Sequence, residues 1–459
     1  MQDNSIIQQA LAGTGITELN EMQLAVLKAG TSKDMILLSP TGSGKTLAFL
    51  LPLLSTFTNE EKKIQALIIA PSRELALQIE SVFRSLGSGY KVNCCYGGHP
   101  LRTEKKSLEH PPTLLIGTPG RLVDHIERGN VDLETVRTLI LDEFDKSLEL
   151  GFTEEMKIIL SHLPRVKRRV LTSATSAIEI PDFTGITAPV KLFFLEEQKK
   201  GDSALEVKIV RSPERDKLET LYKLLGELNG ESTLVFCNLR EAVERVRNYL
   251  TSMGLEAGIF HGGMEQLDRE RELSHFRNGS STVFISTDLA SRGLDIQEVK
   301  HIIHYHLPVN EEAYIHRNGR TARMNATGNA WIILNDIETV PEYITREPEE
   351  YFLPAKTKEP VRSEWTTLTI NRGKRDKLSK KDIVGFLFQK GGLEKDQLGV
   401  VEVKEGSSFA AVKREAFDAM MDRIRDEKIK NMRATFNYSE HTHQGGITPR
   451  GTLRYLYRG

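Results

Sequence analysis

The chain has 459 residues, of which 39% are hydrophobic and 27% charged, and its formal net charge is -1. This length is too great for one compact core, so two or three domains are expected, and the apolar fraction excludes a disordered chain. Three cysteines are too few for a disulfide framework, and none has metal-ligand spacing. The polar first residues do not resemble a secretory signal and the apolar runs are too short to cross a bilayer, so we expect a cytoplasmic protein.

The first part of the chain alternates short apolar runs with helical patterns such as Glu74–Leu86 and Glu154–Ser161. The predicted strands are Met35–Ser39, Ala66–Ala70, Thr113–Gly117, Thr138–Leu141 and Arg169–Thr172. This alternation predicts an α/β domain with a parallel sheet covered on both faces. We place that domain at residues 1–198 and a polar linker at 199–205.

The first predicted strand runs directly into a phosphate-loop sequence that a helix follows. The loop consists of Pro40, Thr41, Gly42, Ser43, Gly44, Lys45 and Thr46. Its glycines allow backbone N–H groups to turn toward phosphate oxygens, Lys45 supplies a positive charge, and the Thr46 hydroxyl is predicted to ligate Mg²⁺. The alternative is a Gly-rich turn that binds nothing, but the strand–loop–helix context favours a nucleotide site.

The predicted strand Thr138–Leu141 ends in Asp142-Glu143-Phe144-Asp145. Asp142 is predicted to hold Mg²⁺, and Glu143 to orient or deprotonate the attacking water. A lone acidic tetrapeptide is more often a solvated strand end. Other predicted strands carry polar signals at the same end, however, and these are Ser39, Pro71–Glu74, Thr118–Arg121 and Ser173–Thr175. Because the carboxyl ends of parallel strands share one edge of a sheet, we predict a single site there.

The alternation then restarts and predicts a second α/β domain at residues 206–337, with helices such as Arg240–Met253 and Leu267–Phe276. Its predicted strands are Thr233–Cys237, Gly258–Phe260, Thr282–Ser286, His301–Tyr305 and Ala330–Leu334. A Pro- and Glu-rich stretch follows, and we interpret residues 338–365 as another linker.

Three arginines at 317, 320 and 323 follow the strand His301–Tyr305 of this second domain. Their spacing predicts that they share one face of a helix. A basic helix face is commonly just solvated. Opposite a phosphate-loop domain, it is better interpreted as a set of arginine fingers that reach a γ-phosphate across a cleft, an arrangement worth about 10³–10⁵ in rate.

The last predicted domain spans residues 366–437, and a basic tail occupies 438–459. Its elements in order are strand Thr366–Ile370, helix Lys380–Gln389, strands Leu398–Val403 and Phe409–Val412, helix Arg414–Arg425 and strand Asn431–Phe436. This βαββαβ order is an α+β plan of the split-βαβ type. The domain holds 16 Lys and Arg against 11 Asp and Glu, which suggests a polyanionic partner, although charge alone fits a merely solvated surface or a protein-contact domain as well.

Taken together and in this order, these blocks resemble the DEAD-box RNA helicases of superfamily 2 over roughly residues 15–335. Further matching segments are Gly97-Gly98, His261-Gly262-Gly263, Gln266 with Arg269, and Thr287–Asp295. The resemblance implies two tandem RecA-like domains, ATP and Mg²⁺ as cofactors, and RNA-stimulated ATP hydrolysis. It implies RNA as the partner, with neither DNA nor a membrane. A DNA translocase, a non-catalytic RNA chaperone and a phosphate-loop kinase remain the rival functions.

The resemblance also implies a role for each matching residue. The catalytic residues would be Lys45, Asp142, Glu143, Arg320 and Arg323, and ATP would be bound by the phosphate loop together with Gln23, Gly293 and Asp295. Ser173, Thr175 and His316 would couple hydrolysis to RNA release. The RNA backbone would be bound by Pro71, Arg73, Gly97, Gly98, Thr118, Gly120, Arg121, Gly262, Arg269 and Thr287.

Two features qualify the resemblance. Phe144 stands where the family has alanine, so we expect added bulk beside Ser173–Thr175 and altered coupling. The C-terminal unit is similar to the RRM-like domain of the DbpA group, which implies structured ribosomal RNA as the target and a role in ribosome biogenesis. Its RNA contacts would be Arg372, Lys374, Arg375 and Lys377. Phe409 lacks the aromatic partners of ordinary RRMs, so base stacking on the sheet is not predicted.

Overall fold

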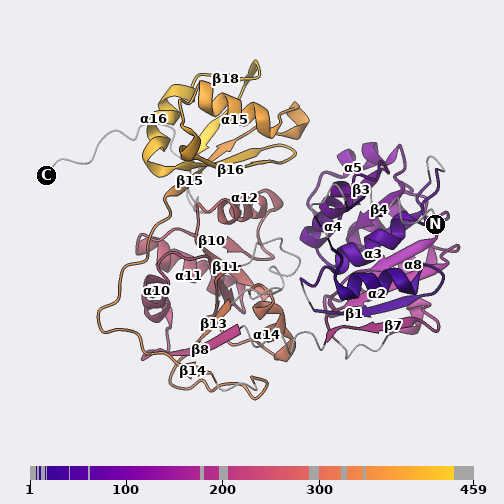
Figure 1. Cartoon of the computed structure of the whole chain (residues 1–459), viewed down its shortest axis with the longest axis horizontal. Helices are drawn as coiled ribbons and strands as arrows, with labels where there is room; N and C mark the ends of the chain where they lie inside the picture. The colour runs from indigo at the N-terminus through magenta and orange to yellow at the C-terminus, as the bar shows by residue number, and fades with distance from the viewer. Residues whose placement is uncertain are drawn as a thin grey trace.

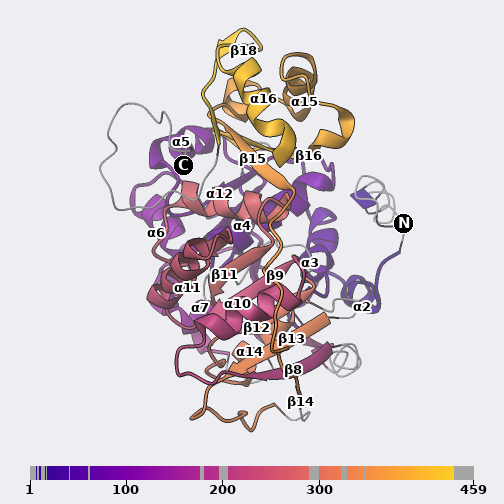
Figure 2. The same ribbon diagram turned by 90° about the vertical axis from the view of Figure 1, so that its left-hand side faces the viewer.

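Two seven-stranded sheets and one four-stranded sheet form the bases of three domains, as the computed structural model shows (Figures 1 and 2). The structure describes residues 7, 10–11, 16, 18–40, 42–59, 63–175, 180–195, 205–288, 299–321, 328–344 and 348–438. Among these residues, no helix has the length and apolarity needed to span a membrane.

The first domain is built on a seven-stranded sheet of order β3-β4-β2-β5-β6-β1-β7, in which every neighbouring pair is parallel. Its strands are β1 (Met35–Leu38), β2 (Ala66–Ile69), β3 (Val92–Cys95), β4 (Leu114–Gly117), β5 (Thr138–Leu141), β6 (Arg168–Ser173) and β7 (Val190–Phe193). Its helices are α2 (Glu21–Ala29), α3 (Lys45–Leu54), α4 (Arg73–Ser85), α5 (Leu101–Leu108), α6 (Pro119–Glu127), α7 (Phe144–Glu149) and α8 (Thr153–Ser161). Alternate residues of β1 enter two different apolar clusters, Leu37 in one and Ile36 in the other, because helices cover both faces.

The second domain repeats this plan with the parallel order β10-β11-β9-β12-β13-β8-β14. Its strands are β8 (Leu205–Arg211), β9 (Thr233–Cys237), β10 (Ala257–Phe260), β11 (Val283–Thr287), β12 (His301–His304), β13 (Gly328–Leu334) and β14 (Glu349–Glu350). The helices that bear on the site are α10 (Leu218–Glu227), α11 (Arg240–Ser252), α12 (Gln266–Arg277) and α14 (Glu311–Asn318). The predicted tandem α/β architecture is therefore confirmed.

In the first two domains the sequence missed four of the described strands, β3, β7, β8 and β14, which lie at or next to the sheet edges. Edge strands bury less of their surface than central strands, so they lack a continuous apolar run. The strand β7 alternates between half-buried and exposed residues, and β8 carries two exposed residues among buried ones. The predicted strands are almost entirely buried, as in β5, and they include the edge strand β10, which is buried at all four positions.

The third domain is an antiparallel sheet of order β16-β17-β15-β20, covered on one face by α15 (Lys380–Gln389) and α16 (Arg414–Ile424). Its strands are β15 (Trp365–Ile370), β16 (Leu398–Val403), β17 (Ser408–Lys413) and β20 (Phe436–Tyr438). The predicted last strand Asn431–Phe436 was wrong. Lys430 and Asn431 both adopt left-handed backbone conformations and turn a hairpin between β18 (Lys428–Ile429) and β19 (Met432–Arg433). Only from Phe436 does the chain pair with β15.

The segment from residue 348 to 364 lies along the second domain as an extended strap, although the sequence suggested a simple linker (Figures 1 and 2). The strap passes over glycines of that domain. A Cβ atom on Gly226 of α10 would lie 1.9 Å from the Lys358 carbonyl oxygen, and one on Gly230 would lie 3.2 Å from Val361. Side chains at these positions would displace the strap. The strap therefore lies on the bare backbone of Gly226 and Gly230, which form a glycine track.

The open face of the third sheet is docked on α12 and the loop that follows it. Thr367 of β15 shares hydrogen bonds with Asn278 (Nδ2 to Oγ1, 2.9 Å) and with Ser280 (2.9 Å). Phe409 of β17 is buried, with its ring edge-on to His275 at a centroid distance of 6.5 Å. The face on which ordinary RRMs stack bases is therefore covered by the second domain.

Candidate nucleotide and RNA site

The phosphate loop joins β1 to α3 at the carboxyl edge of the first sheet. Gly44 has φ of 89°, and a Cβ atom there would lie 2.6 Å from the Gln23 amide nitrogen, so only glycine fits. The Lys45 ammonium is buried and donates to the Ser39 carbonyl oxygen at 2.9 Å. Thr46 opens the helix beside it. Pro40, Gly42 and Ser43 complete the described part of the loop, and Thr41 lies outside the described residues.

Gln23 lies against this loop and caps the helix α2. Its Oε1 accepts from the Asn20 backbone N–H at 3.0 Å, while the Asn20 side chain accepts from the Gln23 N–H at 2.9 Å, which is a capping box. The other end of the Gln23 amide is 3.4 Å from the Gly44 carbonyl oxygen, and the Asn20 amide donates to the Ser43 carbonyl oxygen at 2.8 Å. Gln23, which the resemblance assigns to ATP binding, thus lies directly against the phosphate loop.

Asp142 and Glu143 follow β5 and are both buried. Thr172 of β6 donates to Asp142 at 2.5 Å and accepts from the Glu143 backbone N–H at 3.1 Å. Glu143 has φ of 45° and ψ of 53°, a left-handed conformation that costs a non-glycine residue of order 1–3 kcal/mol. Sequence reasoning gave no sign of this strained turn, which directs the chain from the strand into α7.

The environment of the two carboxyls makes them weaker acids than usual. Burial raises the pKa of Asp142, while Lys45 and the Thr172 hydroxyl oppose that rise. Burial and the neighbouring Asp142 raise the pKa of Glu143, while Lys45 and Arg320 lower it. The charge of one cation from each domain, Lys45 of the first and Arg320 of the second, therefore acts on the Glu143 carboxyl.

The prediction that the three arginines share one helix face was wrong. The helix α14 ends at Asn318 with Gly319 as its C-cap, so Arg320 lies on the turn beyond it. Arg317 is buried within the second domain, where it bonds both carboxylate oxygens of Asp288 at 2.6 and 2.7 Å. Of the two described arginines, Arg320 is the one whose charge lowers the pKa of Glu143. Arg323, Gly293 and Asp295 lie outside the described residues.

Asp145 connects the acidic box to the predicted coupling residues. Ser173 donates to its Oδ2 at 2.9 Å, and the Thr175 hydroxyl lies 3.3 Å from the same oxygen. His316 of the second domain lies in the same polar cluster as Asp145. Phe144 is fully buried in an apolar cluster with Leu141, Met156 and Ile159, so its ring fills the core of the first domain.

The predicted RNA residues of the two domains meet across the cleft. Arg269 of α12 pairs with Glu74 of α4 at 3.2 Å and donates to the Gly262 carbonyl oxygen at 2.9 Å. Arg73 reaches Gln266 at 3.4 Å. The Arg73 guanidinium also lies against the Gly97-Gly98 turn, since a Cβ atom on Gly98 would lie 2.6 Å from its Nη1. Pro71, Thr118 and Gly120 follow strands β2 and β4 at the carboxyl edge of the first sheet, and Thr287 ends β11 of the second sheet.

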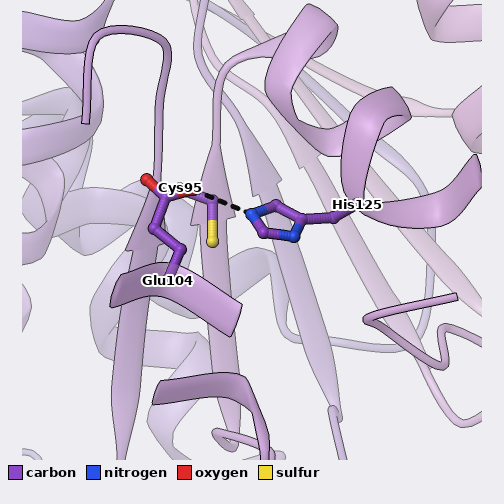
Figure 3. Close-up of side chains that lie close together, drawn as sticks. All are labelled: Cys95, Glu104 and His125. Carbon is purple, nitrogen blue, oxygen red and sulfur yellow. Dashed lines mark hydrogen bonds and ion pairs between the residues drawn. The ribbon is translucent and has the colours of Figure 1, made fainter. Parts of the chain in front are cut away.

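A buried carboxylate beside the Gly97-Gly98 turn escaped the sequence analysis. Figure 3 shows Glu104 of α5 next to His125 of α6 and Cys95 of β3. His125 Nε2 lies 2.8 Å from Glu104 Oε2, and its Nδ1 lies 3.2 Å from the Asn130 amide, so Nε2 carries the proton that is donated to Glu104. Burial raises the pKa of the Cys95 thiol, which keeps it protonated and makes it a poor metal ligand.

Arg121 is engaged with this carboxylate. Its Nη1 donates to Glu104 Oε2 at 2.8 Å, and both Nη atoms donate to the His99 carbonyl oxygen at 3.0 and 3.1 Å. Burial alone would raise the pKa of Glu104, but hydrogen bonds from His125, His99 and the Tyr96 N–H, with Arg121, bring it to about 2. The carboxylate is thus already neutralised, and Arg121 braces the glycine turn from within the protein.

The predicted RNA residues of the third domain form part of an exposed basic surface. Lys374, Arg375 and Lys377 are exposed, and Arg372 is half-buried, with its Nε donating to the Arg433 carbonyl oxygen at 3.2 Å. Lys430 of the neighbouring hairpin donates to the Lys377 carbonyl oxygen at 2.9 Å. Lys430 and Arg433 extend the basic surface beyond the predicted set, because the hairpin returns the chain beside the first loop.

Comparison with known proteins decides the family. The DEAD/DEAH box helicase family matches residues 20–183, the helicase conserved C-terminal domain matches 216–325, and the DbpA RNA binding domain matches 367–437. The ATP-dependent RNA helicase DbpA of Bacillus subtilis is 30% identical over 88% of this chain and 91% of its own length. The DbpA protein of Escherichia coli is 31% identical over 90% and 95%.

This chain belongs to the DEAD-box ATP-dependent RNA helicases. It is therefore an ATP-hydrolysing enzyme that binds RNA, and it carries a DbpA-type RNA-binding domain at its C-terminal side. Among solved structures, Saccharomyces cerevisiae Dbp5 bound to RNA and ADP BeF3 matches this helicase with a TM-score of 0.67 and 25% identity, over 76% of this chain and 93% of that one. The DEAD-box helicase Mss116p, at 23% identity and a TM-score of 0.66, shares the fold.

Proposed function

We propose that this helicase hydrolyses ATP between Glu143 of the first domain and Arg320 of the second, and that RNA bound across both domains closes the cleft. One observation carries the proposal. The pKa of the Glu143 carboxyl, raised by burial and by Asp142, is lowered by both Lys45 and Arg320. Cations from both domains thus act on one buried carboxylate, and cations so placed are suited to stabilising the charge that develops on a γ-phosphate.

In this proposal each residue of the cleft has one task. The Glu143 carboxylate accepts a proton from the attacking water, and Lys45 leaves the Ser39 carbonyl oxygen to bind the phosphates. Arg320 stabilises negative charge on the equatorial oxygens as the bond to the γ-phosphorus breaks. Arg323, Gly293, Asp295 and Thr41 belong to the same proposal on the basis of the family resemblance.

The residues at this site also fit a magnesium ion. The half-buried Thr46 hydroxyl makes no hydrogen bond to another described residue, and Asp142 offers a buried carboxylate at the same edge of the sheet. Hydroxyl and carboxylate oxygens are the ligands that Mg²⁺ prefers. We propose that these two residues hold the ion, which would neutralise phosphate charge when bound.

The RNA backbone is proposed to occupy the strand-end surface where Arg73, Arg269 and the Gly97-Gly98 turn meet. Arginines pair with phosphates, and exposed glycines allow close approach of the main chain, so binding there should tolerate any sequence. Arg121 would act indirectly, since its donors are used by Glu104 and His99. Hydrolysis would be coupled to RNA release through Asp145, Ser173, Thr175 and His316.

The third domain is proposed to bind structured RNA, with ribosomal RNA as the target that the resemblance to the DbpA group suggests. Its sheet face is covered, so the contact would use the exposed basic surface of Lys374, Arg375, Lys377, Lys430 and Arg433. Such a surface binds phosphates by charge and recognises the shape of the RNA.

Two variants of the full chain test the catalytic part. Glu143→Gln is expected to abolish RNA-stimulated phosphate release while ATP still binds. Arg320→Ala is expected to slow turnover by about 10³-fold or more with little loss of nucleotide affinity. Normal hydrolysis by either variant would show that the role assigned to that residue is wrong. Stimulation by DNA equal to that by RNA would favour a DNA translocase instead.

A further inference from the structure

Lys146 is one of the most deeply buried cations among the described residues. It follows the acidic box on α7, and its side chain is 1% exposed. Its Nζ lies 2.8 and 3.0 Å from the two carboxylate oxygens of Glu149 on the same helix. It also pairs with Glu312, which belongs to α14 of the second domain. A buried ammonium needs such partners, and here one of them lies across the cleft.

Glu312 connects this cation to the predicted coupling residue. The Glu312 oxygen that meets Lys146 lies 3.3 Å from His316 Nε2, one turn further along α14. His316, Glu312 and Asp145 lie close enough for their polar atoms to share one centre, but the Lys146 ammonium already supplies the positive charge there. The cluster is therefore an ionic contact between domains, with no need of a metal ion.

We propose that Lys146 and Glu312 are positioning residues that form a closing ion pair and set the place of Arg320 relative to Glu143. Lys146 is bound to the site on its own side, because its backbone N–H donates to the Glu143 carbonyl oxygen at 3.0 Å. Glu312 lies in the first turn of α14, the helix whose end leads directly to Arg320. Locking α14 to α7 therefore fixes two residues of the reaction in one step.

The ion pair between Lys146 and Glu312 favours the closed state of the two domains. When the domains separate, Lys146 keeps Glu149, and Glu312, whose side chain is already 25% exposed, is hydrated by water, so neither charge is buried without a partner. Closure adds the contact between them, and the pair thus stabilises the closed state over the open state. The inference rests on the proposed roles of Glu143 and Arg320, and its test must separate the two.

A double-mutant cycle on the full chain provides that test. The variants are Lys146→Met, Glu312→Gln and the two combined, with Lys146→Arg as the conservative replacement. The readouts are kcat/KM for ATP at saturating RNA, and the affinity of a non-hydrolysable ATP analogue without RNA. Each neutral variant is expected to lose about tenfold in kcat/KM. The double variant should lose no more than the worse single, Lys146→Arg should keep most activity, and analogue affinity should stay unchanged.

Lys157→Met removes a solvent-exposed partner of Glu154 on α8 and serves as the matched control, expected to behave as wild type. Thermal unfolding of each variant separates misfolding from loss of closure, and Glu312→Gln, which changes a partly exposed residue, keeps the test valid if Lys146→Met unfolds. Additive losses in the cycle, or full activity in Glu312→Gln, would overturn the closing ion pair. Arg320→Ala is measured in parallel, because normal turnover there would instead refute the proposed catalytic role.

Discussion

The second domain meets its two neighbours through chemically different surfaces. Toward the first domain it offers charged side chains, with Arg269 pairing with Glu74 and Glu312 with Lys146. Toward the third domain it offers mainly neutral contacts, namely the buried hydrogen bond between Asn278 and Thr367 and a ring contact from His275, with one partly exposed ion pair between Glu256 and Arg414 at 3.3 Å. Charged groups regain water at little cost when they separate, whereas buried neutral partners do not. The difference indicates one interface built to open and one built to stay closed.

The largest expected change in the free energy of unfolding comes from displacing the strap, residues 348–364, from the second domain. Gly226→Ala would place a Cβ atom 1.9 Å from the Lys358 carbonyl oxygen, so either the strap or α10 must move. We expect overpacking to lower the free energy of unfolding by about 2 kcal/mol. Calorimetric unfolding of the full chain measures this, and resonance energy transfer between the second and third domains reports whether the strap has lifted.

The control is Gly385→Ala on α15, where a new Cβ atom meets nothing within 4 Å. Alanine in an open helical position should raise the free energy of unfolding by up to about 1 kcal/mol. Equal effects from the two alanines would mean that the strap is not held by its glycine track.

Low pH should affect the interface between the first and second domains, through the Glu143 carboxyl. Burial raises the pKa of Glu143 above its ordinary 4.5, and only the ionised carboxylate can accept a proton. The kcat/KM for ATP at saturating RNA should therefore fall about tenfold per pH unit below that raised pKa. The same shift means that stability contributed by this group is lost as the pH rises through the window between the two pKa values, so acid should slow turnover before it unfolds the domain.

A pH profile of the ATPase, with circular dichroism recorded in parallel, checks both halves of this expectation. An acid limb at or below pH 4.5, or one that coincides with unfolding, would contradict the role of the buried carboxylate.

The docked interface should also lose stability when a single hydroxyl is removed. Thr367→Val leaves the buried Asn278 amide and the Ser280 hydroxyl without their shared partner, which should cost about 1 kcal/mol. Thr435→Val removes an exposed hydroxyl of the same domain and should change the free energy of unfolding by less than about 0.5 kcal/mol. Chemical denaturation of both variants compares them. Equal losses would mean that the docked face is hydrated.

Salt is expected to produce the smallest effect and to separate the interfaces most directly. Raising the ionic strength from 0.1 to 1 M shortens the screening length from about 10 to about 3 Å. The Lys146–Glu312 and Arg269–Glu74 pairs are largely buried and are screened little while the domains are in contact, but salt stabilises the same charges once the domains separate. Energy transfer between the first and second domains should therefore fall with salt, while transfer between the second and third should fall less, because the ion pair Glu256–Arg414 at that interface is partly exposed. Parallel decreases would show that both interfaces depend on charge.

Local sequence patterns were enough to identify the phosphate loop, the acidic box and the central strands, because each is specified within a few consecutive residues. The error at the arginine helix had a visible signal, since Gly319 is a common helix terminator and placed the end of α14 before Arg320. Glu104 and the pair Lys146–Glu312 carried no such signal. Their partners are distant in the chain, and only the folded arrangement of the domains brings them together.

The glycine track beneath residues 348–364 also bears on how a bound RNA would be handled. A flexible segment of that length would let the third domain and its RNA move by roughly 20 Å, and their local concentration would then determine how often the RNA meets the two ATPase domains. A segment held along its length against the second domain removes this freedom of movement. An RNA bound to the third domain would therefore be held at one fixed distance and orientation relative to the ATP-binding cleft.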